Sequence, residues 1–314
     1  MAYQTQSIFV SPELKSSRPL NINQARFDYL RPTLSTSPTP VNHLSQFAES
    51  TTIWRRGTST SRRIVSPAKA LAMFSKMNAV DGSAIGTNKI YRYGYFSAQI
   101  KLVAGNSAGT LATFYLKTKD TSPVHDELDF EFLGNSSGQP YALQTNVFAA
   151  NTLGREQRTF LWFDPTADFH QYSFLWNQHI IIFSVDSTII RIFPNDNRLQ
   201  VPYVYNPMRL YATIYNADDW VTQGGKVKID WRNAPFKISL RDIKIEGCPV
   251  GEVTCSQGPS GGPSQGLWWD QPQFWSLSDS QMARLKYVQK HYMIYNYCTD
   301  TRRYPKPPAE CINS

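Results

Sequence analysis

The sequence predicts an all-β fold, an antiparallel sandwich or barrel, and two observations carry that prediction. From about residue 90 onward, short strand-like runs follow one another closely, with no helical pattern between them. Turn signals such as Asp164-Pro165 and Asn206-Pro207 separate several of these runs. Many short strands with turns between them are typical of sandwiches and barrels. The predicted strands span residues 90–102, 110–117, 127–133, 142–149, 158–163, 171–176, 180–186, 208–216 and 236–246.

The first of these runs shows the strand pattern clearly. Apolar side chains occupy every second position, at Phe96, Ala98, Ile100 and Leu102. Successive side chains of a strand point to opposite faces of the sheet, so this period of two gives one face for a core. The run therefore predicts a strand with one face buried.

One convincing helical pattern lies near the end of the chain, in residues 278–295. Leu285, Val288, Tyr292 and Tyr295 recur there at helical spacing. The preceding segment, residues 251–266, is rich in Gly, Ser and Pro and predicts a flexible loop.

The chain divides into three predicted parts. Residues 1–66 are rich in Ser, Thr, Pro and Arg and lack sustained periodicity, which predicts a disordered or atypical leader. Residues 67–247 contain the predicted strands of the sandwich domain, and residues 248–314 form a small C-terminal extension with the helix.

The charge of the chain argues against nucleic-acid binding. The net charge is +8 over 314 residues, but residues 1–66 hold eight Lys/Arg and three acidic residues. Only +3 remains for the other 248 residues, which show no basic stripe. No stretch is long and apolar enough to predict a membrane span.

The four cysteines, Cys248, Cys255, Cys298 and Cys311, all lie late in the sequence. No C-x-x-C pair or histidine cluster accompanies them, so the sequence predicts disulfides and no metal site. Disulfides imply an oxidising compartment. Asn135 opens an N-glycosylation sequon, yet the N-terminus lacks the pattern of a signal peptide.

Residues 125–132 carry the candidate chemistry. In a strand, His125, Glu127, Asp129 and Glu131 share one face, while the other face is mostly apolar. Three carboxylates in a row repel one another and weaken a sheet, and such local conflicts are expected at functional sites.

Two carboxyl groups that flank a glycosidic bond at about 5–5.5 Å are the requirement for retaining glycosidases. Glu127 and Glu131 have Cα atoms about 13 Å apart in an ideal strand, and their long side chains can lean inward across Asp129. Asp129 can share a proton with its neighbours, which raises one pKa and keeps another carboxylate ionised. The alternatives are a solvated acidic face and a calcium site, although an EF-hand loop needs different spacing.

These residues carry a resemblance to a known family. Residues 125–135, HDELDFEFLGN, resemble the active-site segment of plant xyloglucan endotransglucosylase/hydrolases, within glycoside hydrolase family 16. Similar blocks follow in the family's order from about 90 to 314: QTNVF (144–148), GREQ (154–157), LWFDPTADFHQYSFLWN (161–177), YNADDWVTQGGKVKIDWRNAPF (215–236) and YCTDTRRYP (297–305). The resemblance implies a concanavalin-like β-jelly-roll whose C-terminal extension lengthens the acceptor side of a cleft.

The resemblance also implies roles for individual residues. Glu127 is then the nucleophile, Asp129 the assisting residue and Glu131 the acid/base. Sugar contacts fall on Gln144, Thr145, Asn146, Arg155, Glu156, Asp219, Trp220, Gly225 and Arg303. The family's glycan site falls on Asn135, and its two bridges fall on Cys248–Cys255 and Cys298–Cys311. Without the resemblance, Trp220 is more simply interpreted as a core residue.

The implied activity is retaining cleavage of the β-1,4-linked backbone of xyloglucan. The glycosyl-enzyme chain then passes to a xyloglucan polymer or oligosaccharide, or to water, without a metal or cofactor. The implied protein is a monomer secreted to the plant cell wall or apoplast, with no nucleic-acid or membrane partner.

The N-terminal part departs from the family pattern. The family begins with a signal peptide and an N-terminal strand, and nothing before about residue 70 matches them. Residues 71–88 only faintly echo the turn that follows in the family. We therefore expect that two strands of the sandwich are absent or replaced. The alternative interpretation is a truncated, inactive member that at most binds glucan.

Overall fold

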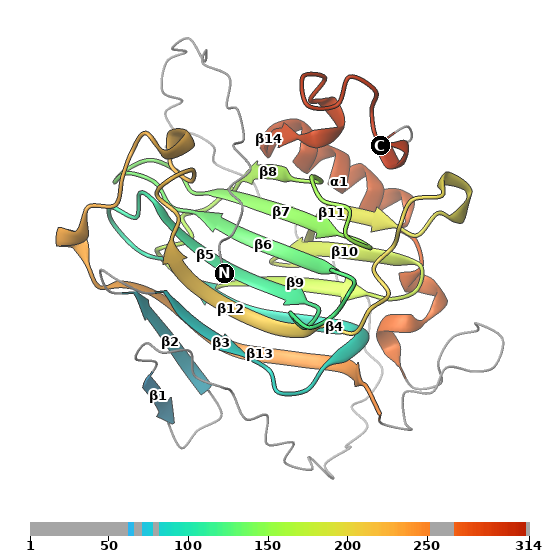
Figure 1. Cartoon of the computed structure of the whole chain (residues 1–314), viewed down its shortest axis with the longest axis horizontal. Coiled ribbons are helices and arrows are strands. Elements are labelled where there is room, and N and C mark those ends of the chain that lie inside the picture. Colours follow the sequence, from blue (N-terminus) through green and yellow to red (C-terminus); the bar gives the residue numbers. More distant parts are fainter. Residues whose placement is uncertain (1–61, 66–70, 78–81, 252–266, 312–314) are drawn as a thin grey trace, which may run out of the picture. The chain divides into compact units, whose positions relative to one another are not determined.

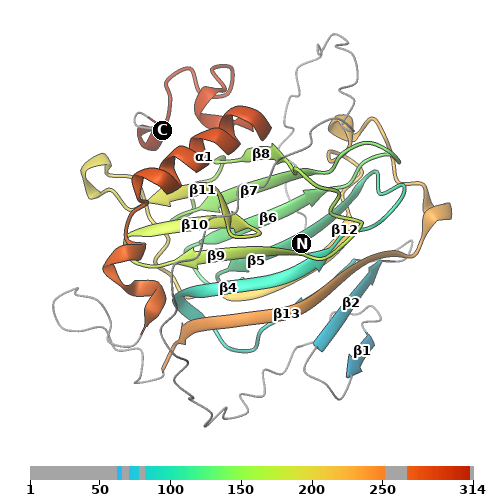
Figure 2. The ribbon, with the colours of Figure 1, turned by 180° about the vertical axis from the view of Figure 1, so that it is seen from behind.

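The computed structural model describes residues 62–65, 71–77, 82–251 and 267–311. Two seven-stranded antiparallel sheets and one α-helix form this described part, which confirms the predicted fold class. Figures 1 and 2 show the two sheets stacked as layers. No helix of the described ranges is long and apolar enough to cross a bilayer.

The sheet that carries the candidate residues is named the β6 sheet. Its strands, in order across the sheet, are β14 (Met293–Asn296), β8 (Gln157–Phe160), β7 (Ala142–Phe148), β6 (Glu127–Leu133), β5 (Thr110–Lys117), β12 (Arg209–Asn216) and β3 (Ser83–Gly86). β6 is the central strand, so its side chains have neighbours on both sides.

The second sheet, named the β9 sheet, covers one face of the first. Its strands, in order, are β1 (Arg62–Val65), β2 (Leu71–Met77), β13 (Phe236–Pro249), β4 (Tyr91–Lys101), β9 (His170–Trp176), β10 (Ile180–Val185) and β11 (Thr188–Pro194). The main hydrophobic core consists of buried side chains from both sheets.

Aromatic side chains fill the space between the sheets. Phe130 of β6 contacts Phe174 of β9, with ring centroids 4.7 Å apart, and Phe183 of β10, at 5.4 Å. Phe114 of β5 stacks on Phe174 at 5.6 Å. All four rings are essentially fully buried. Because large aromatic rings each remove much apolar surface from water, these contacts hold the two sheets face to face.

The predicted strands match the observed ones, but several strands were missed. β11 follows β10 through a two-residue turn, Asp186-Ser187, in which both residues have positive φ, 46° and 63°. Such turns suit hairpins, and their usual signal is Asn-Gly or Asp-Gly. Asp-Ser carries a weaker signal, so residues 188–194 were not predicted as a strand.

We expected two strands to be absent or replaced, and for the described residues their absence is wrong. β2 pairs with β13, and β3 pairs with β12. Both partner strands therefore have a neighbour on this side, which leaves no unpaired backbone there. β1 lies at 62–65, inside the segment predicted to be disordered, while residues 1–61 lie outside the described residues.

The single α-helix, α1, spans Asp279–Tyr292 and begins at a capping box in which Ser278 and Gln281 bond each other's backbone N–H. It contacts β11, β14 and β8, and both views place it along that side of the sandwich (Figures 1 and 2). The predicted helix ran to residue 295. It ends earlier because Met293–Asn296 pairs with β8 as strand β14.

Candidate active site

Strand β6 separates two kinds of side chain, as its sequence predicts. Leu128, Phe130 and Phe132 are buried in the core between the sheets. Glu127, Asp129 and Glu131 occupy the alternate positions and therefore project from the opposite face of the β6 sheet. The apolar positions fix the register of the strand, because a slip of one residue would bury the carboxylates.

Glu131 is bound by the neighbouring strand. Gln144 of β7 lies opposite it in the ladder, and Gln144 Nε2 donates a hydrogen bond to Glu131 Oε2 at 3.0 Å. Arg158 of β8 lies opposite Gln144, and its Nε donates to Gln144 Oε1 at 2.7 Å. The three side chains form one hydrogen-bonded row across three strands, which fixes the orientation of the Gln144 amide.

The surroundings of Glu131 suit a proton donor. Burial raises the pKa of Glu131 to about 7, and the charges of Glu156 and Glu127 act in the same direction. The Gln144 hydrogen bond and the Arg158 charge lower this pKa. A carboxyl group whose pKa is near neutrality can give up and take back a proton during one reaction cycle.

Asp129 lies between the two glutamates and is almost fully buried, with 4% of its surface exposed. Burial raises its pKa well above the ordinary value, and the charges of Glu127 and Glu131 raise it further. Its side chain also shares a hydrogen bond with Glu127. The raised pKa of Asp129 favours its protonated form, which can donate to the hydrogen bond with Glu127.

Glu127 begins the strand and has a second partner from the residues just before it. The Nε2 atom of His125 contacts Oε2 of Glu127 at hydrogen-bond distance. Asp129 holds Glu127 from the next position along the strand. Of the carboxylates on this face, Glu127 is thus the one with a hydrogen-bond partner both before it and after it in the chain.

The three residues of β7 that were predicted to contact sugar point to two different faces of the β6 sheet. Gln144 and Asn146 lie opposite Glu131 and Asp129 in the ladder, on the face of the carboxylates. The side chain of Thr145 points to the opposite face of the sheet, where its hydroxyl accepts a hydrogen bond from Nη1 of buried Arg191 of β11 at 3.1 Å. Thr145 thus helps to join the two sheets, and its side chain is not brought to the carboxylate face.

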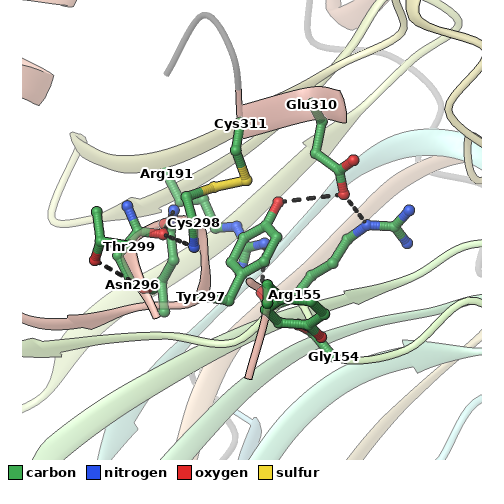
Figure 3. The surroundings of a disulfide bond; sticks show 11 residues. Gly154, Arg155, Arg191, Asn296, Tyr297, Cys298, Thr299, Glu310 and Cys311 are labelled. Atoms are coloured by element: carbon green, nitrogen blue, oxygen red, sulfur yellow. Dashed lines mark hydrogen bonds and ion pairs between the residues drawn. A yellow bond between two sulfur atoms is a disulfide. The ribbon is translucent and has the colours of Figure 1, made fainter. Parts of the chain in front are cut away.

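In the segment before β8, the two residues predicted to contact sugar, Arg155 and Glu156, have different partners. Arg303 Nη1 donates to Glu156 Oε2 at 2.5 Å, which brings these two predicted residues together. Arg155 is buried, with 3% exposed, and its Nε donates to Glu310 Oε1 at 2.5 Å. Figure 3 shows Arg155 and Glu310 beside the ring of Tyr297. The predicted sugar contact of Arg155 is therefore not supported by its position.

The loop after β12 contains the remaining predicted contacts. Asp219 is exposed, and Trp220 is half-buried against a small apolar cluster that contains Leu133. Gly225 has φ +82°, and a Cβ there would lie 2.0 Å from the Asp219 carbonyl oxygen. Only glycine fits that turn, so the backbone of the loop itself accounts for Gly225.

Thr222 fastens this loop to the β6 sheet. Its buried hydroxyl accepts a bond from Gly109 N at 2.7 Å and donates to the Gly134 carbonyl at 2.8 Å. These glycines lie just before β5 and just after β6, so one side chain ties the loop to two strand ends. Beside it is a cavity of about 200 Å³, lined by Leu133, Gly134, Asn135, Gln139, Ala142, Arg158, Val221, Thr222, Gln223 and Ile294.

The remaining predicted sites involve cysteines and a glycan. Cys298 and Cys311 form a disulfide, which confirms that bridge (Figure 3). Cys248 is buried, and its predicted partner, Cys255, lies outside the described residues. Asn135 is half-buried in the turn after β6, and its Nδ2 donates to the Pro140 carbonyl at 3.1 Å.

Sequence reasoning missed four residues that build the site. Arg158 is the first residue of the strand predicted over 158–163, but it was given no role. His125 was placed on the correct face but was given no role. Arg191 and Thr222 carried no sequence signal, because their partners are 36 to 113 residues away in the chain.

Two family models match the chain. The model of glycosyl hydrolases family 16 matches residues 50–233. The model of the xyloglucan endo-transglycosylase C-terminus matches residues 263–311.

Curated relatives match over most of the same region. Xyloglucan endotransglucosylase protein 34 of Populus tremula x Populus tremuloides is 48% identical over 234 residues, which cover 73% of this chain and 76% of the relative. Probable xyloglucan endotransglucosylase/hydrolase protein 5 of Arabidopsis thaliana is 48% identical over 234 residues, with 73% and 77% covered. Xyloglucan endotransglucosylase protein 2 of Diospyros kaki is 49% identical over 234 residues, with 73% and 76% covered. The chain therefore belongs to the xyloglucan endotransglucosylase/hydrolases of glycosyl hydrolase family 16.

Proposed function

We propose that this protein cleaves the β-1,4-linked backbone of xyloglucan with retention and transfers the cut chain to a second xyloglucan or to water. The single observation that carries the proposal is the arrangement on β6, where Glu127, Asp129 and Glu131 share one face above an apolar core. The relatives named above are xyloglucan endotransglucosylases, which identifies the substrate class. A role limited to glucan binding is not favoured, because binding does not require a proton-donating carboxyl beside an anionic one.

In the first step, a carboxylate oxygen of Glu127 forms a bond to the anomeric carbon. The glycosidic C–O bond breaks, and its electron pair goes to the leaving oxygen, which takes the proton of Glu131. The pKa of Glu131, about 7, lets this group hold the required proton at mildly acidic pH. Asp129 remains protonated and stabilises the Glu127 carboxylate through their hydrogen bond.

In the second step, the bond between Glu127 and the sugar breaks. The hydroxyl of an acceptor sugar, or a water molecule, attacks the anomeric carbon and gives its proton to Glu131. The electron pair returns to the carboxylate of Glu127. Two inversions at the same carbon leave the configuration of the linkage unchanged.

The substrate contacts are assigned to side chains that the structure brings to the carboxylate face or its borders. They are Gln144, Asn146, Glu156, Asp219, Trp220 and Arg303. Thr145 and Arg155 are given supporting roles, because their partners are Arg191 and Glu310. We further propose that the protein acts as a monomer in the cell wall and carries a glycan on Asn135. The proposal also divides the chain into a leader up to residue 66, a sandwich domain up to residue 247 and a C-terminal extension.

Transfer is tested with the full chain, xyloglucan as donor and a fluorescent xyloglucan oligosaccharide as acceptor. We expect labelled polymer to form, and we expect Glu127→Ala and Glu131→Gln to lower its formation by at least about a thousandfold. A matched control is Asp196→Asn, because Asp196 is a carboxylate that pairs with Arg198 at the surface. Full activity of Glu127→Ala, or inversion of the new linkage by NMR, would exclude the proposal.

A further inference from the structure

We propose that His125 is a positioning residue for the nucleophile. Its ring nitrogen holds the Glu127 carboxylate in the orientation of attack and stabilises that carboxylate when it is released in the second step. The inference rests on the proposed function, and it assigns a role to a residue that the mechanism above leaves unused.

The contact itself is direct. The Nε2 atom of His125 lies at hydrogen-bond distance from Oε2 of Glu127, which is two residues further along the chain. A nucleophilic carboxylate is ionised and only accepts hydrogen bonds, so the proposed role of Glu127 places the hydrogen on Nε2 of the ring. Hydrogen bonds to ionised groups are stronger than those between neutral groups.

The ring of His125 is held in place from several directions. It stacks on Phe148 with centroids 5.0 Å apart and planes 1° apart. Phe148 is the residue of β7 that faces Glu127 across the ladder, so one cross-strand position supports both members of the pair. The backbone of His125 is also bonded, because its N–H donates to Asn151 Oδ1 at 2.8 Å and its carbonyl accepts from Asn151 N at 3.0 Å.

Asp129 and Lys117 also lie beside Glu127. Asp129 bonds Glu127 from the strand side, where it is almost fully buried. On the β5 side, Lys117 faces Glu127 in the ladder, and its ammonium forms an ion pair with Asp120 at 3.1 Å. The side chain of His125 is 36% exposed, so this donor lies where Glu127 meets the open face.

Both chemical steps depend on such a donor. In the first step, a fixed donor on one oxygen orients the carboxylate toward the sugar. In the second, negative charge returns to that carboxylate as the glycosyl ester breaks, and a donor already in place stabilises the developing charge. The proton of His125 stays on the ring throughout, so Glu131 remains the group that exchanges a proton with the substrates.

The test uses two substitutions that separate the ring from its N–H group. His125→Phe keeps a flat ring to stack on Phe148 but has no donor, whereas His125→Gln places an amide N–H near the position of Nε2. We expect His125→Phe to lower kcat by about 10- to 100-fold with little change in KM, because one hydrogen bond to a charged group is lost. We expect His125→Gln to recover most of that loss.

A second substrate locates the defect. This substrate is an aryl glycoside of a xyloglucan oligosaccharide. Its activated phenol departs as a phenolate and does not need the proton of Glu131. If His125 acts on Glu127, the His125→Phe defect persists with this donor. A matched control is His170→Phe, since His170 also stacks on a phenylalanine, Phe163, and bonds a carboxylate, Asp186, at 2.6 Å on the β9 sheet. We expect that control to keep wild-type rates.

Three outcomes overturn the inference. The first is His125→Phe at the wild-type rate, and the second is a defect that disappears with the activated donor. The third is an equal loss of rate in His125→Phe and His125→Gln together with an equal loss of melting temperature, which indicates a purely structural role. An inactive wild-type chain contradicts the proposed function instead, so the two failures are distinguishable.

Discussion

Glu131 lies half-buried on a sheet face, between an amide that donates to it and two carboxyl groups that repel its charge. Its acidity is therefore set first by burial and then by the side chains around it. Thr145 and Arg155 show the opposite case at the same scale. Strand alternation turns the Thr145 side chain toward Arg191, and Arg155, in the segment before β8, is buried against Glu310.

The raised pKa of Glu131 gives a pH dependence with a definite sign. The first step requires protonated Glu131, so kcat/KM should fall as pH rises through about 7 and should be about tenfold lower at pH 8 than on its plateau. The measurement is a pH profile of transfer with natural xyloglucan as donor. The fall of kcat/KM at high pH should be absent in Glu131→Gln, and also in the wild type with an activated aryl donor.

A control for this prediction uses the partner of Glu131. The Gln144 hydrogen bond lowers the pKa of Glu131, so Gln144→Leu should move the falling limb to higher pH, besides lowering the rate. A limb that stays in place in Gln144→Leu and persists in Glu131→Gln belongs to another group.

At the scale of the element, strand β6 is fixed at its start by a buried carboxylate. Asp126 is fully buried, and it accepts bonds from Ala150 N at 2.7 Å, Tyr205 N at 3.0 Å and Asn206 N at 2.8 Å. The Asn206 amide adds a fourth bond at 2.9 Å. One side chain thus ties two loops to the residue that precedes Glu127.

We predict that Asp126→Asn destabilises the protein by about 2–4 kcal/mol. The amide presents an N–H group to a site lined by N–H donors, which leaves buried donors without acceptors. Urea unfolding measures the change. The control is Asp120→Asn, since the Asp120 side chain is 89% exposed, and a loss for Asp126→Asn no larger than for this control would contradict the assigned role.

At the scale of the whole molecule, the loop between Cys298 and Cys311 adds charged contacts with the sandwich to the pairing of β14 with β8. The Cys298–Cys311 disulfide closes a loop with a sequence separation of 13 residues, and the loop contains Glu310 (Figure 3). Glu310 pairs with buried Arg155, whose carbonyl accepts a bond from Arg191 at 2.7 Å. Arg303, in the same loop, reaches Glu156. The disulfide therefore keeps two charged contacts in place.

We predict that Cys311→Ser destabilises the chain by about 3 kcal/mol, because the reduced loop gains entropy when unfolded. Glu310→Gln should lower the free energy of unfolding by about as much, since it leaves Arg155 buried without its partner charge.

In the double variant, the loss of unfolding free energy should be less than the sum of the two single losses, as measured by a thermal-unfolding mutant cycle. The control is Asp196→Asn at the exposed pair with Arg198, which should change stability by less than about 1 kcal/mol. Strict additivity would show that bridge and ion pair act independently.

The sequence by itself determined the all-β class, most strands of the sandwich and the shared face of Glu127, Asp129 and Glu131. These features follow from a period of two, which is a local property of the chain. The strand β11 was not predicted, because the Asp186-Ser187 turn before it has a weak turn sequence. The pairing of β2 and β3 depends on their partner strands, so their own residues do not reveal it.

Only the tertiary structure decided which side chains meet across strands. Ladder register sets Gln144 and Arg158 beside Glu131 and Phe148 beside His125, and sheet stacking sets Arg191 against Thr145. The physical reason is that burial and hydrogen bonding depend on neighbours in space. Burial raises the pKa of the Glu131 carboxyl to about 7, and Gln144 and Arg158 of the neighbouring strands lower it, so the strand alone does not encode its acidity.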